Sequence, residues 1–348
     1  RISRRQERER IFSGDVGHTG GLGCEIPPVL YCIRLMKTIR RTRAGSAMKR
    51  RTKQTIFYWS ILALPLLQFG IFYVGVNFNS LLLAFRQFDV MTNESSFVGF
   101  SNFAQVFRDI GQLEYLHIAF RNSLLLCAVN LVFGTGFALL FSYYIYKKRL
   151  FAGMFKVFLF IPHIISAVIM VTIYKFFVDR AIPYFAQTLF SVEMSGLLAD
   201  PDTVFGTVLF FAVWVSFGTQ TIMYTGAMSG ISDSVVEAAK LDGVTPLKEF
   251  WFITLPSIFP TVVTFVVVCV AGIFTNQMHL YSFYGQNAEY KLYNIGYFLY
   301  SETQSAAGSG SYMEYPYLSA FGLVLTCIAV PLTLIVRWAM NKFGPKAD

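Results

Sequence analysis

Charged residues are scarce in this chain of 348 residues: they make up 14% of it, against roughly 25% in an average soluble domain. The five cysteines form no C-x-x-C pair, so the sequence shows neither a disulfide framework nor a metal site. It also lacks a phosphate-binding loop and the H-E-x-x-H and G-x-S-x-G motifs, which argues against an enzyme. Hydrophobic residues, by contrast, make up 55%. This composition is typical of an integral membrane protein.

Six apolar segments are long enough to cross a bilayer, which takes roughly 20 helical residues. They cover approximately 56–83, 119–146, 155–178, 203–228, 257–280 and 317–340. None contains an internal aspartate or glutamate, and proton-coupled carriers generally need an ionisable group of this kind inside the membrane. The pattern therefore weighs against an ion-coupled secondary transporter, which stays the alternative from a different class.

The charges between these segments alternate. Basic residues precede the first segment, fill the connection between the second and third, lie in the loop after the fourth and follow the last. The other three loops are acidic or balanced. Because cytoplasmic loops carry the excess of lysine and arginine, both termini and the loop after the fourth segment should be cytoplasmic. The sequence thus predicts an all-α integral membrane protein with six transmembrane helices.

Residues 1–47 do not follow this pattern. Of the 29 basic residues, 14 fall within residues 1–53, and no sustained apolar period accompanies them. Met48-Lys49-Arg50-Arg51 ahead of an apolar helix is typical of a natural start. We therefore interpret residues 1–47 as a disordered or artefactual basic leader and residues 48–348 as the transmembrane domain. A basic arm that contacts anionic lipid headgroups is the alternative.

The loop after the fourth segment carries the most informative motif. It contains Glu237-Ala238-Ala239, then Gly243, then Ile253-x-Leu255-Pro256. A short alanine-rich helix offers a face that another protein can approach closely. Gly243 allows a turn that a side chain would obstruct, and Pro256 suits the first turn of the next helix. An ordinary amphipathic helix on the membrane surface would not need the distant I-x-L-P element.

The spacing E-A-A-x3-G-x9-I-x-L-P resembles the cytoplasmic coupling loop of ABC-importer permeases, which a separate ATPase drives. Further matches in the same order extend the resemblance over most of residues 50–345: Val98-Gly99-Phe100-Ser101-Asn102-Phe103, Phe160-Ile161-Pro162, Trp214 with Gly218, and Pro260. Together they are similar to the carbohydrate permeases of the maltose and multiple-sugar type. The chain departs from the maltose permease in having no large extracytoplasmic insertion, and it has Val244 where that family usually has alanine.

The resemblance implies a type I ABC importer permease fold with a coupling loop at about 229–256. It assigns the ATPase contact to Glu237, Ala238, Ala239, Asp242, Gly243, Leu255 and Pro256. It also implies a second homologous permease subunit, an extracytoplasmic sugar-binding protein, and two ATPase subunits that hold ATP and Mg. No cofactor is expected in this chain and no nucleic acid among its partners. Membrane lipid should surround it in the bacterial cytoplasmic (inner or plasma) membrane. An importer permease for a non-sugar solute is the nearest alternative.

Polar side chains inside the apolar segments are candidates for the substrate site, because such groups are costly in a membrane. They are Thr219 and Gln220 beside Phe217, and Asn276 and Gln277 beside Phe274. Amides offer donors and acceptors to hydroxyl groups, and the two phenylalanine rings would stack on sugar faces. By the resemblance, Asn276 matches a sugar-contacting asparagine of the maltose permease. Hydrogen bonding between helices is the alternative role, and we interpret His279 as structural.

Overall fold

The computed structural model describes residues 52–88, 95–309 and 314–345. The basic leader interpreted from residues 1–47 lies outside the described residues. The chain divides into two compact units after Gly75, and each is described by itself. The described part of the first unit is helical from Thr52, with a π-helical turn at Phe69–Gly75. Its apolar side chains are exposed almost throughout, as expected of a helix whose surroundings are apolar.

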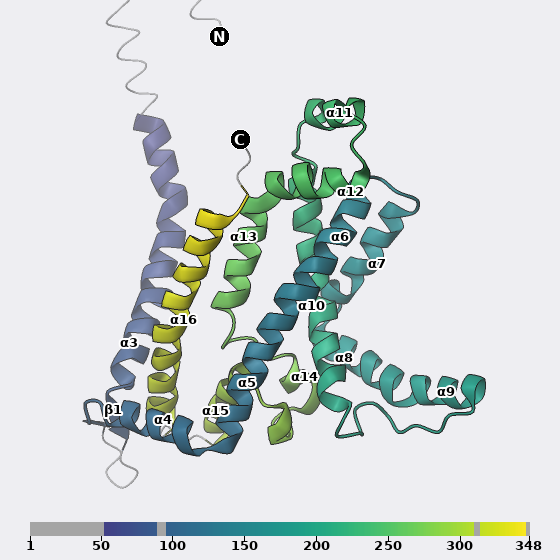
Figure 1. The fold of residues 1–348 in the computed structure, drawn as a ribbon. Helices are drawn as coiled ribbons and strands as arrows, with labels where there is room; N and C mark the ends of the chain where they lie inside the picture. Colours follow the sequence, from purple (N-terminus) through teal and green to yellow (C-terminus); the bar gives the residue numbers. More distant parts are fainter. Residues whose placement is uncertain (1–51, 89–94, 310–313, 346–348) are drawn as a thin grey trace, which may run out of the picture. The chain divides into compact units, whose positions relative to one another are not determined.

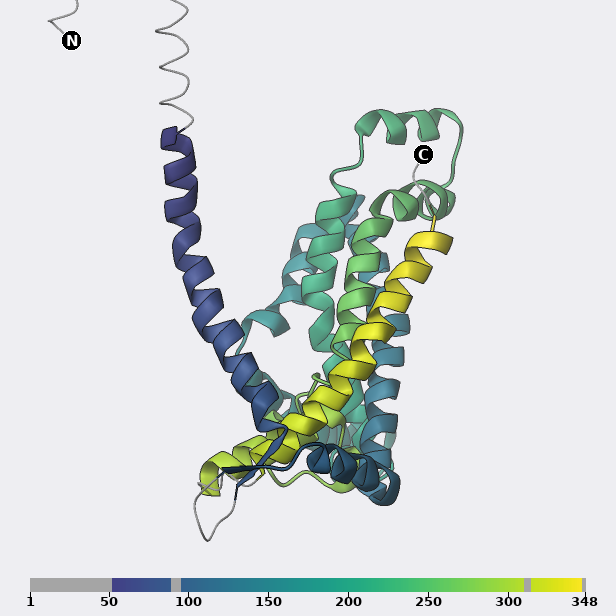
Figure 2. The same cartoon turned by 90° about the vertical axis from the view of Figure 1, so that its left-hand side faces the viewer.

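In its described residues, the second unit is a bundle of helices with one short pair of antiparallel strands (Figure 1). Its elements are α3 (Val76–Leu83), β1 (Arg86–Phe88), β2 (Ser95–Phe97), α4 (Ser101–Gln112), α5 (Glu114–Val129), α6 (Thr135–Tyr146), α7 (Ala152–Ile164), α8 (Ala167–Phe176), α9 (Ile182–Phe190), α10 (Val204–Met228), α11 (Asp233–Leu241), α12 (Pro246–Glu249), α13 (Leu255–Ala271), α14 (Leu280–Tyr284), α15 (Ile295–Ser309) and α16 (Tyr315–Phe343). Strands β1 and β2 pair antiparallel, with Arg86 opposite Phe97. Figures 1 and 2 place α11 at one end of the long helices, and α4 and α15 at the other.

Among the described residues, five helices are long and apolar enough to cross a membrane. They are Thr52–Leu83, Glu114–Tyr146, Val204–Met228, Pro246–Ala271 and Tyr315–Phe343. A sixth span requires counting Ala152–Ile164 and Ala167–Phe190 as one, although the two pieces meet at 107°. The coarse prediction of a helical, multi-span protein is therefore confirmed, and the continuous helix expected at 155–178 is replaced by a broken one.

The break after α7 has a local cause. Ile165 and Ser166 have extended backbone, with ψ of 142° and 134°, so the helix cannot continue through them. Pro162, one turn earlier, lacks the N–H that a helix interior needs and weakens the last turn of α7. The chain then leaves α7 in a new direction as α8 and α9 (Figure 1).

The helix expected at 257–280 also ends early, at Ala271. Beyond it the backbone is irregular until α14, and Met278 and His279 both have positive φ. The side chain of Asn294 donates to the Asn276 carbonyl at 2.8 Å. A Cβ on Gly296 would lie only 2.6 Å from that carbonyl, so glycine is what admits the close approach. Irregular backbone at membrane depth is tolerated where protein groups satisfy it in this way.

Two clusters of buried side chains hold the second unit together. The larger one includes Phe211, Tyr297 and Phe321 and joins α5, α8, α10, α15 and α16. The smaller one includes Tyr224, Phe250 and Ile258 and joins α6, α10 and α13. Because Phe250 directly follows α12, the smaller cluster fixes the segment next to α11 to the long helices.

Candidate functional site

Helix α11 carries the E-A-A motif and ends in a closed turn. Gly243 has a φ of +69°, its N–H donates to the Lys240 carbonyl at 3.1 Å, and the N–H of Val244 donates to the Ala239 carbonyl at 3.0 Å. These two bonds form a Schellman motif, which favours glycine because of its left-handed backbone. The turn predicted at Gly243 is therefore present. Asp233 in the first turn adds a favourable interaction with the helix dipole.

Helix α11 stands off from the ends of the long helices on two connecting segments (Figure 1). Glu237, Ala238 and Asp242 are exposed, whereas Ala239 is buried. Leu241, beside the motif, is 90% exposed. In the segment that follows, Leu247 and Phe252 are 68% and 77% exposed. Large apolar side chains with this exposure favour contact with another protein or with lipid.

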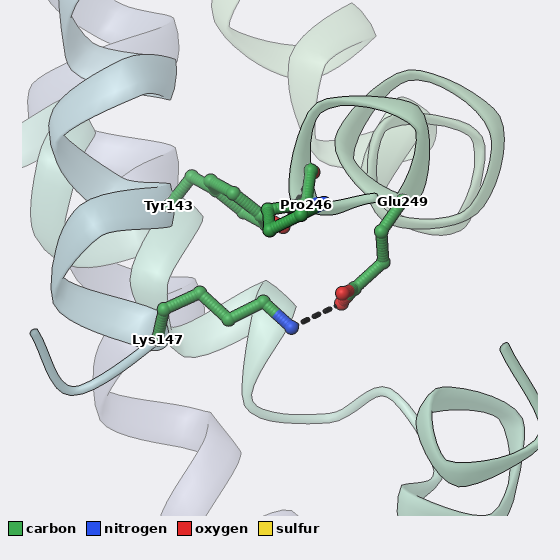
Figure 3. Close-up of polar contacts among 4 residues, drawn as sticks. All are labelled: Tyr143, Lys147, Pro246 and Glu249. Atoms are coloured by element: carbon green, nitrogen blue, oxygen red, sulfur yellow. Dashed lines mark hydrogen bonds and ion pairs between the residues drawn. The ribbon is translucent and has the colours of Figure 1, made fainter. Parts of the chain in front are cut away.

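The segment after α11 is fixed to the end of α6 (Figure 3). Glu249 on α12 is 4% exposed and forms an ion pair with Lys147, the C-cap residue directly after α6. One turn earlier, the Tyr143 hydroxyl donates to the Pro246 carbonyl at 2.8 Å. The Tyr143 ring also packs edge-on against Phe250, with ring centroids 5.1 Å apart. Charge, hydrogen bond and ring contact thus hold the same two elements together.

Sequence reasoning missed Lys147 and Glu249. In the sequence, Lys147 is one of several basic residues that indicate the membrane orientation, and Glu249 is one acidic residue in a hydrophilic loop. One local signal was available. Glu249 is directly followed by Phe250, and a carboxylate next to an aromatic residue needs a cationic or hydrogen-bonding partner when both are buried, as these two are.

The last two predicted coupling residues, Leu255 and Pro256, lie at the start of α13 and are half-buried. A π-helical turn at Phe250–Thr254 precedes them, and the Leu255 N–H closes it by donating to the Phe250 carbonyl. Leu255 packs against the smaller buried cluster. These two residues therefore anchor the loop in the bundle, while the exposed part of the motif is on α11.

The polar residues predicted on α10 have unusual surroundings. The Thr219 hydroxyl and the Gln220 side-chain oxygen are buried without a hydrogen-bond partner. Buried polar atoms are nearly always paired in proteins, so the two are exceptions to a general rule. Phe217 packs against Phe137 and Phe141, with ring centroids 6.0 Å away in each case.

The candidates beyond α13 are held differently. Asn276 is exposed, and its side-chain oxygen accepts the N–H of Met278 at 2.9 Å. Its amide NH₂ remains the part suited to donate to a sugar hydroxyl. Gln277 is half-buried next to it. Phe274 is only 7% exposed, packs edge-on against Phe120, and borders an apolar hollow of about 440 Å³ between α13 and α16.

A bundle with several helices long and apolar enough to cross a membrane defines a multi-pass membrane protein. Residues 130–348 match the family described as binding-protein-dependent transport system inner membrane component, and the chain belongs to that family. The resemblance inferred from the E-A-A loop is thereby confirmed. The chain is a multi-pass component of a transport system and is not itself the enzyme of that system.

Relatives and a solved structure agree with this assignment. The chain is 24% identical over 281 residues to the probable ABC transporter permease protein YurN of Bacillus subtilis, covering 79% of this chain and 93% of YurN. It is 24% identical over 217 residues to the polygalacturonan/rhamnogalacturonan transport permease YteP of the same organism, covering 61% and 66%. The fold matches a chain of a bacterial ABC transporter that imports alginate, with a TM-score of 0.69, 20% identity and coverage of 89% and 99%.

Proposed function

We propose that this chain is the permease subunit of an ATP-driven ABC importer for sugars of the oligosaccharide class. The observation that carries the proposal is α11: a capped helix with the E-A-A motif, held beyond the bundle, with exposed leucine beside it. The sugar assignment is supported by the carbohydrate-permease motifs and by the relative named for polygalacturonan and rhamnogalacturonan.

In this proposal the chain has six spans, with α7, α8 and α9 together serving as the third. Both termini and α11 face the cytoplasm, because the basic residues gather at that side. A second homologous permease completes the pore, and an extracytoplasmic binding protein delivers the sugar. Two ATPase subunits hold ATP and Mg, and one of them grips α11 through Glu237, Ala238, Asp242 and the turn at Gly243.

The contacts between α12 and α6 would transmit the motion of α11 to a transmembrane helix. When the ATPase dimer closes, α11 is displaced, and α12 follows because only a short connection separates the two helices. The Lys147–Glu249 ion pair and the Tyr143–Pro246 hydrogen bond then oblige the end of α6 to follow α12. We infer that Lys147 and Glu249 are positioning residues, through which motion of the coupling loop reaches a transmembrane helix.

Sugar contact is proposed for four polar residues. Thr219 and Gln220 have buried oxygen atoms that lack a partner, and Asn276 and Gln277 lie where the backbone leaves α13. Phe217 and Phe274, in contrast, are engaged with other rings and would stack on a sugar only after a rearrangement.

We further propose that the basic leader, residues 1–47, is not needed for transport. A chain that starts at Met48 should insert, assemble and transport as well as the full chain, because residues 1–47 contain no segment long enough to span a membrane. Sugar uptake into proteoliposomes, normalised to the amount of assembled complex, is the measurement. A loss of uptake with unchanged assembly would assign a role to the basic arm.

Purification from the membranes of cells that produce all the subunits of the transport system tests the function itself. We expect this chain to copurify with an ATPase and a second permease, and the reconstituted complex to hydrolyse ATP faster when a sugar-loaded binding protein is added. Sugar uptake that is active without any ATPase would favour the secondary transporter. ATP-driven uptake restricted to a solute without a sugar ring would favour the non-sugar importer.

A further inference from the structure

Residues at the start of α5 and in the chain between α14 and α15 line a hollow. These segments lie at the end of the bundle opposite α11 (Figure 1). The volume of the hollow, about 880 Å³, falls in the range of roughly 300–1,000 Å³ typical of small-molecule sites. Three tyrosines, Tyr115, Tyr290 and Tyr293, line it together with Gln286 and Asn287, two exposed residues with amide side chains. Rings beside amides are the combination that a carbohydrate needs, because a sugar has both an apolar ring face and a rim of hydroxyl groups.

The three rings form one aromatic surface. The centroid of Tyr290 lies 5.1 Å from that of Tyr293 and 5.7 Å from that of Tyr115. Tyr293 is buried, but Tyr290 is 63% exposed. The inner rings therefore support the outer one, whose surface stays open to the hollow. Tyrosine in such a position supplies a rigid, amphipathic contact area at low cost in conformational entropy.

The backbone that carries Tyr290 is held by buried polar groups. The side-chain NH₂ of Asn122 on α5, itself 1% exposed, donates to the carbonyls of Lys291 and Tyr293 at 2.9 and 2.8 Å. At the other end of the loop, the Tyr297 hydroxyl donates to the Gly285 carbonyl at 2.9 Å. A loop pinned at both ends presents its rings in a fixed arrangement. Preorganisation of this kind raises affinity because little ordering remains to be done on binding.

The charges at the hollow favour an uncharged ligand. Glu114 and Glu289 line it, against the single base Lys291. A surface with an excess of carboxylates repels a polyanion such as a chain of uronic acids. A neutral oligosaccharide would meet no such repulsion, and its hydroxyl groups would find the amides and carboxylates as hydrogen-bonding partners.

We propose that this hollow is a glycan-binding subsite, in which a neutral oligosaccharide stacks on Tyr290 before it enters the pore. The proposal rests on the proposed function, because it needs the hollow to face the binding protein and the substrate to be a sugar. It adds a site outside the membrane-spanning segments, distinct from the polar groups of α10 and from Asn276, and it names the class of sugar.

The test is direct binding to the membrane complex. The two permeases and the ATPases are placed in nanodiscs without the binding protein, so that only the membrane complex offers a site. Neutral pentasaccharides (maltopentaose, cellopentaose and xylopentaose) and the acidic pentagalacturonate are titrated and followed by saturation-transfer NMR. The variants are Tyr290→Ala and the conservative Tyr290→Phe. Tyr184→Ala on α9 is the matched control, since Tyr184 is 65% exposed but lies outside the hollow.

At least one neutral pentasaccharide should bind, and Tyr290→Ala should raise its Kd by roughly three- to tenfold, the effect of one lost stacking contact. Tyr290→Phe and Tyr184→Ala should leave the Kd unchanged, and pentagalacturonate should bind more weakly than the neutral probe. Glu289→Gln should narrow that difference. Absence of neutral-sugar binding, equal effects of Tyr290→Ala and Tyr184→Ala, or tighter binding of pentagalacturonate would each overturn the proposal.

ATP-driven uptake separates this inference from the proposed function. If the wild-type complex imports sugar but Tyr290→Ala leaves glycan binding unchanged, only the subsite is refuted. A wild-type complex that shows no ATP-driven sugar uptake refutes the proposed function. A third outcome, in which Tyr290→Ala weakens capture of the sugar-free binding protein but not glycan binding, would make the hollow a protein contact and overturn the subsite.

Discussion

Removing either partner of the Lys147–Glu249 ion pair should have unequal consequences. The Glu249 side chain is 6% exposed and that of Lys147 is 17% exposed. Lys147→Met leaves a carboxylate that cannot reach water, and breaking a buried pair in this way costs about 3–5 kcal/mol. Glu249→Leu leaves an ammonium group on a long flexible stem, which can turn toward water. We therefore expect a smaller loss, about 1–2 kcal/mol.

The double variant Lys147→Met/Glu249→Leu should be more stable than Lys147→Met alone. Replacing both partners of a buried pair by apolar side chains of similar volume is often neutral or stabilising. We expect the double variant to lie within about 1 kcal/mol of the wild type, so the effects of the two single changes should not add. The Tyr143–Pro246 hydrogen bond and the Tyr143–Phe250 ring contact remain in all three variants.

Two readouts are needed, because a purely structural pair would change only stability. The first is the thermal unfolding midpoint of the complex in nanodiscs. The second is the amount of sugar imported per ATP hydrolysed in proteoliposomes, which should fall in Lys147→Met and recover in the double variant. Lys156→Met, at an exposed position on α7, is the control. The reasoning fails if Lys147→Met behaves like Lys156→Met, or if the double variant shows the sum of both single losses.

Three further changes have defined outcomes. Gly243→Ala should weaken ATPase capture about fivefold because of φ strain of about 1 kcal/mol, whereas Gly243→Asn should be milder; equal pull-down of the ATPase by both variants would contradict this. Asn276→Asp keeps the acceptor for the Met278 N–H but loses the amide donors, so sugar uptake should fall about 5- to 30-fold while the unfolding midpoint holds. Unchanged uptake, or a fall in the unfolding midpoint that accompanies the fall in uptake, would argue against sugar contact. Burial, and then the charge of Glu314, raise the pKa of the Glu302 carboxyl group in the folded protein. The stability that protonated Glu302 contributes is therefore present below the pKa of the unfolded chain and is lost as the pH rises through the pKa of the folded protein. In Glu302→Gln, the rise in amide exchange of α15 above about pH 4.5 should be flatter than in the wild type. The same pH profile of exchange in both proteins would refute a raised pKa for Glu302.

Much of the architecture was accessible from the sequence, because each feature depends on residues close together in the chain. Apolar length alone located five membrane-length helices, since a bilayer fixes the number of residues that a helix needs, but it did not show the break in the third segment or the early end of the fifth. The turn at Gly243 followed from the position of glycine after an alanine-rich helix, and the structure places it in left-handed backbone. The family followed from the spacing between the E-A-A motif and Pro256, and the match over residues 130–348 confirms it.

The features that escaped prediction depend on tertiary contacts. Apolar length continues past Ala271, but the helix ends there with Gly272 as its C-cap, and in the irregular segment beyond it Asn294, 18 positions away, donates to the Asn276 carbonyl. Likewise, 102 positions separate Lys147 from Glu249, and no local pattern indicates that the two meet. Asn122 reads as a polar residue in a span, yet it pins a loop that is 169 positions away.

The most direct test of the central claim is to ask which protein lies against α11. A photoreactive amino acid is placed at Leu241, which is 90% exposed, and at Tyr184, an exposed position on α9 at the opposite end of the bundle (Figure 1). The assembled complex is irradiated, and the adducts are identified by mass spectrometry. The account predicts a high-yield adduct between position 241 and the ATPase, and none between position 184 and the ATPase. ATPase adducts in equal yield at both positions, or at neither in a complex that still contains the ATPase, would contradict it.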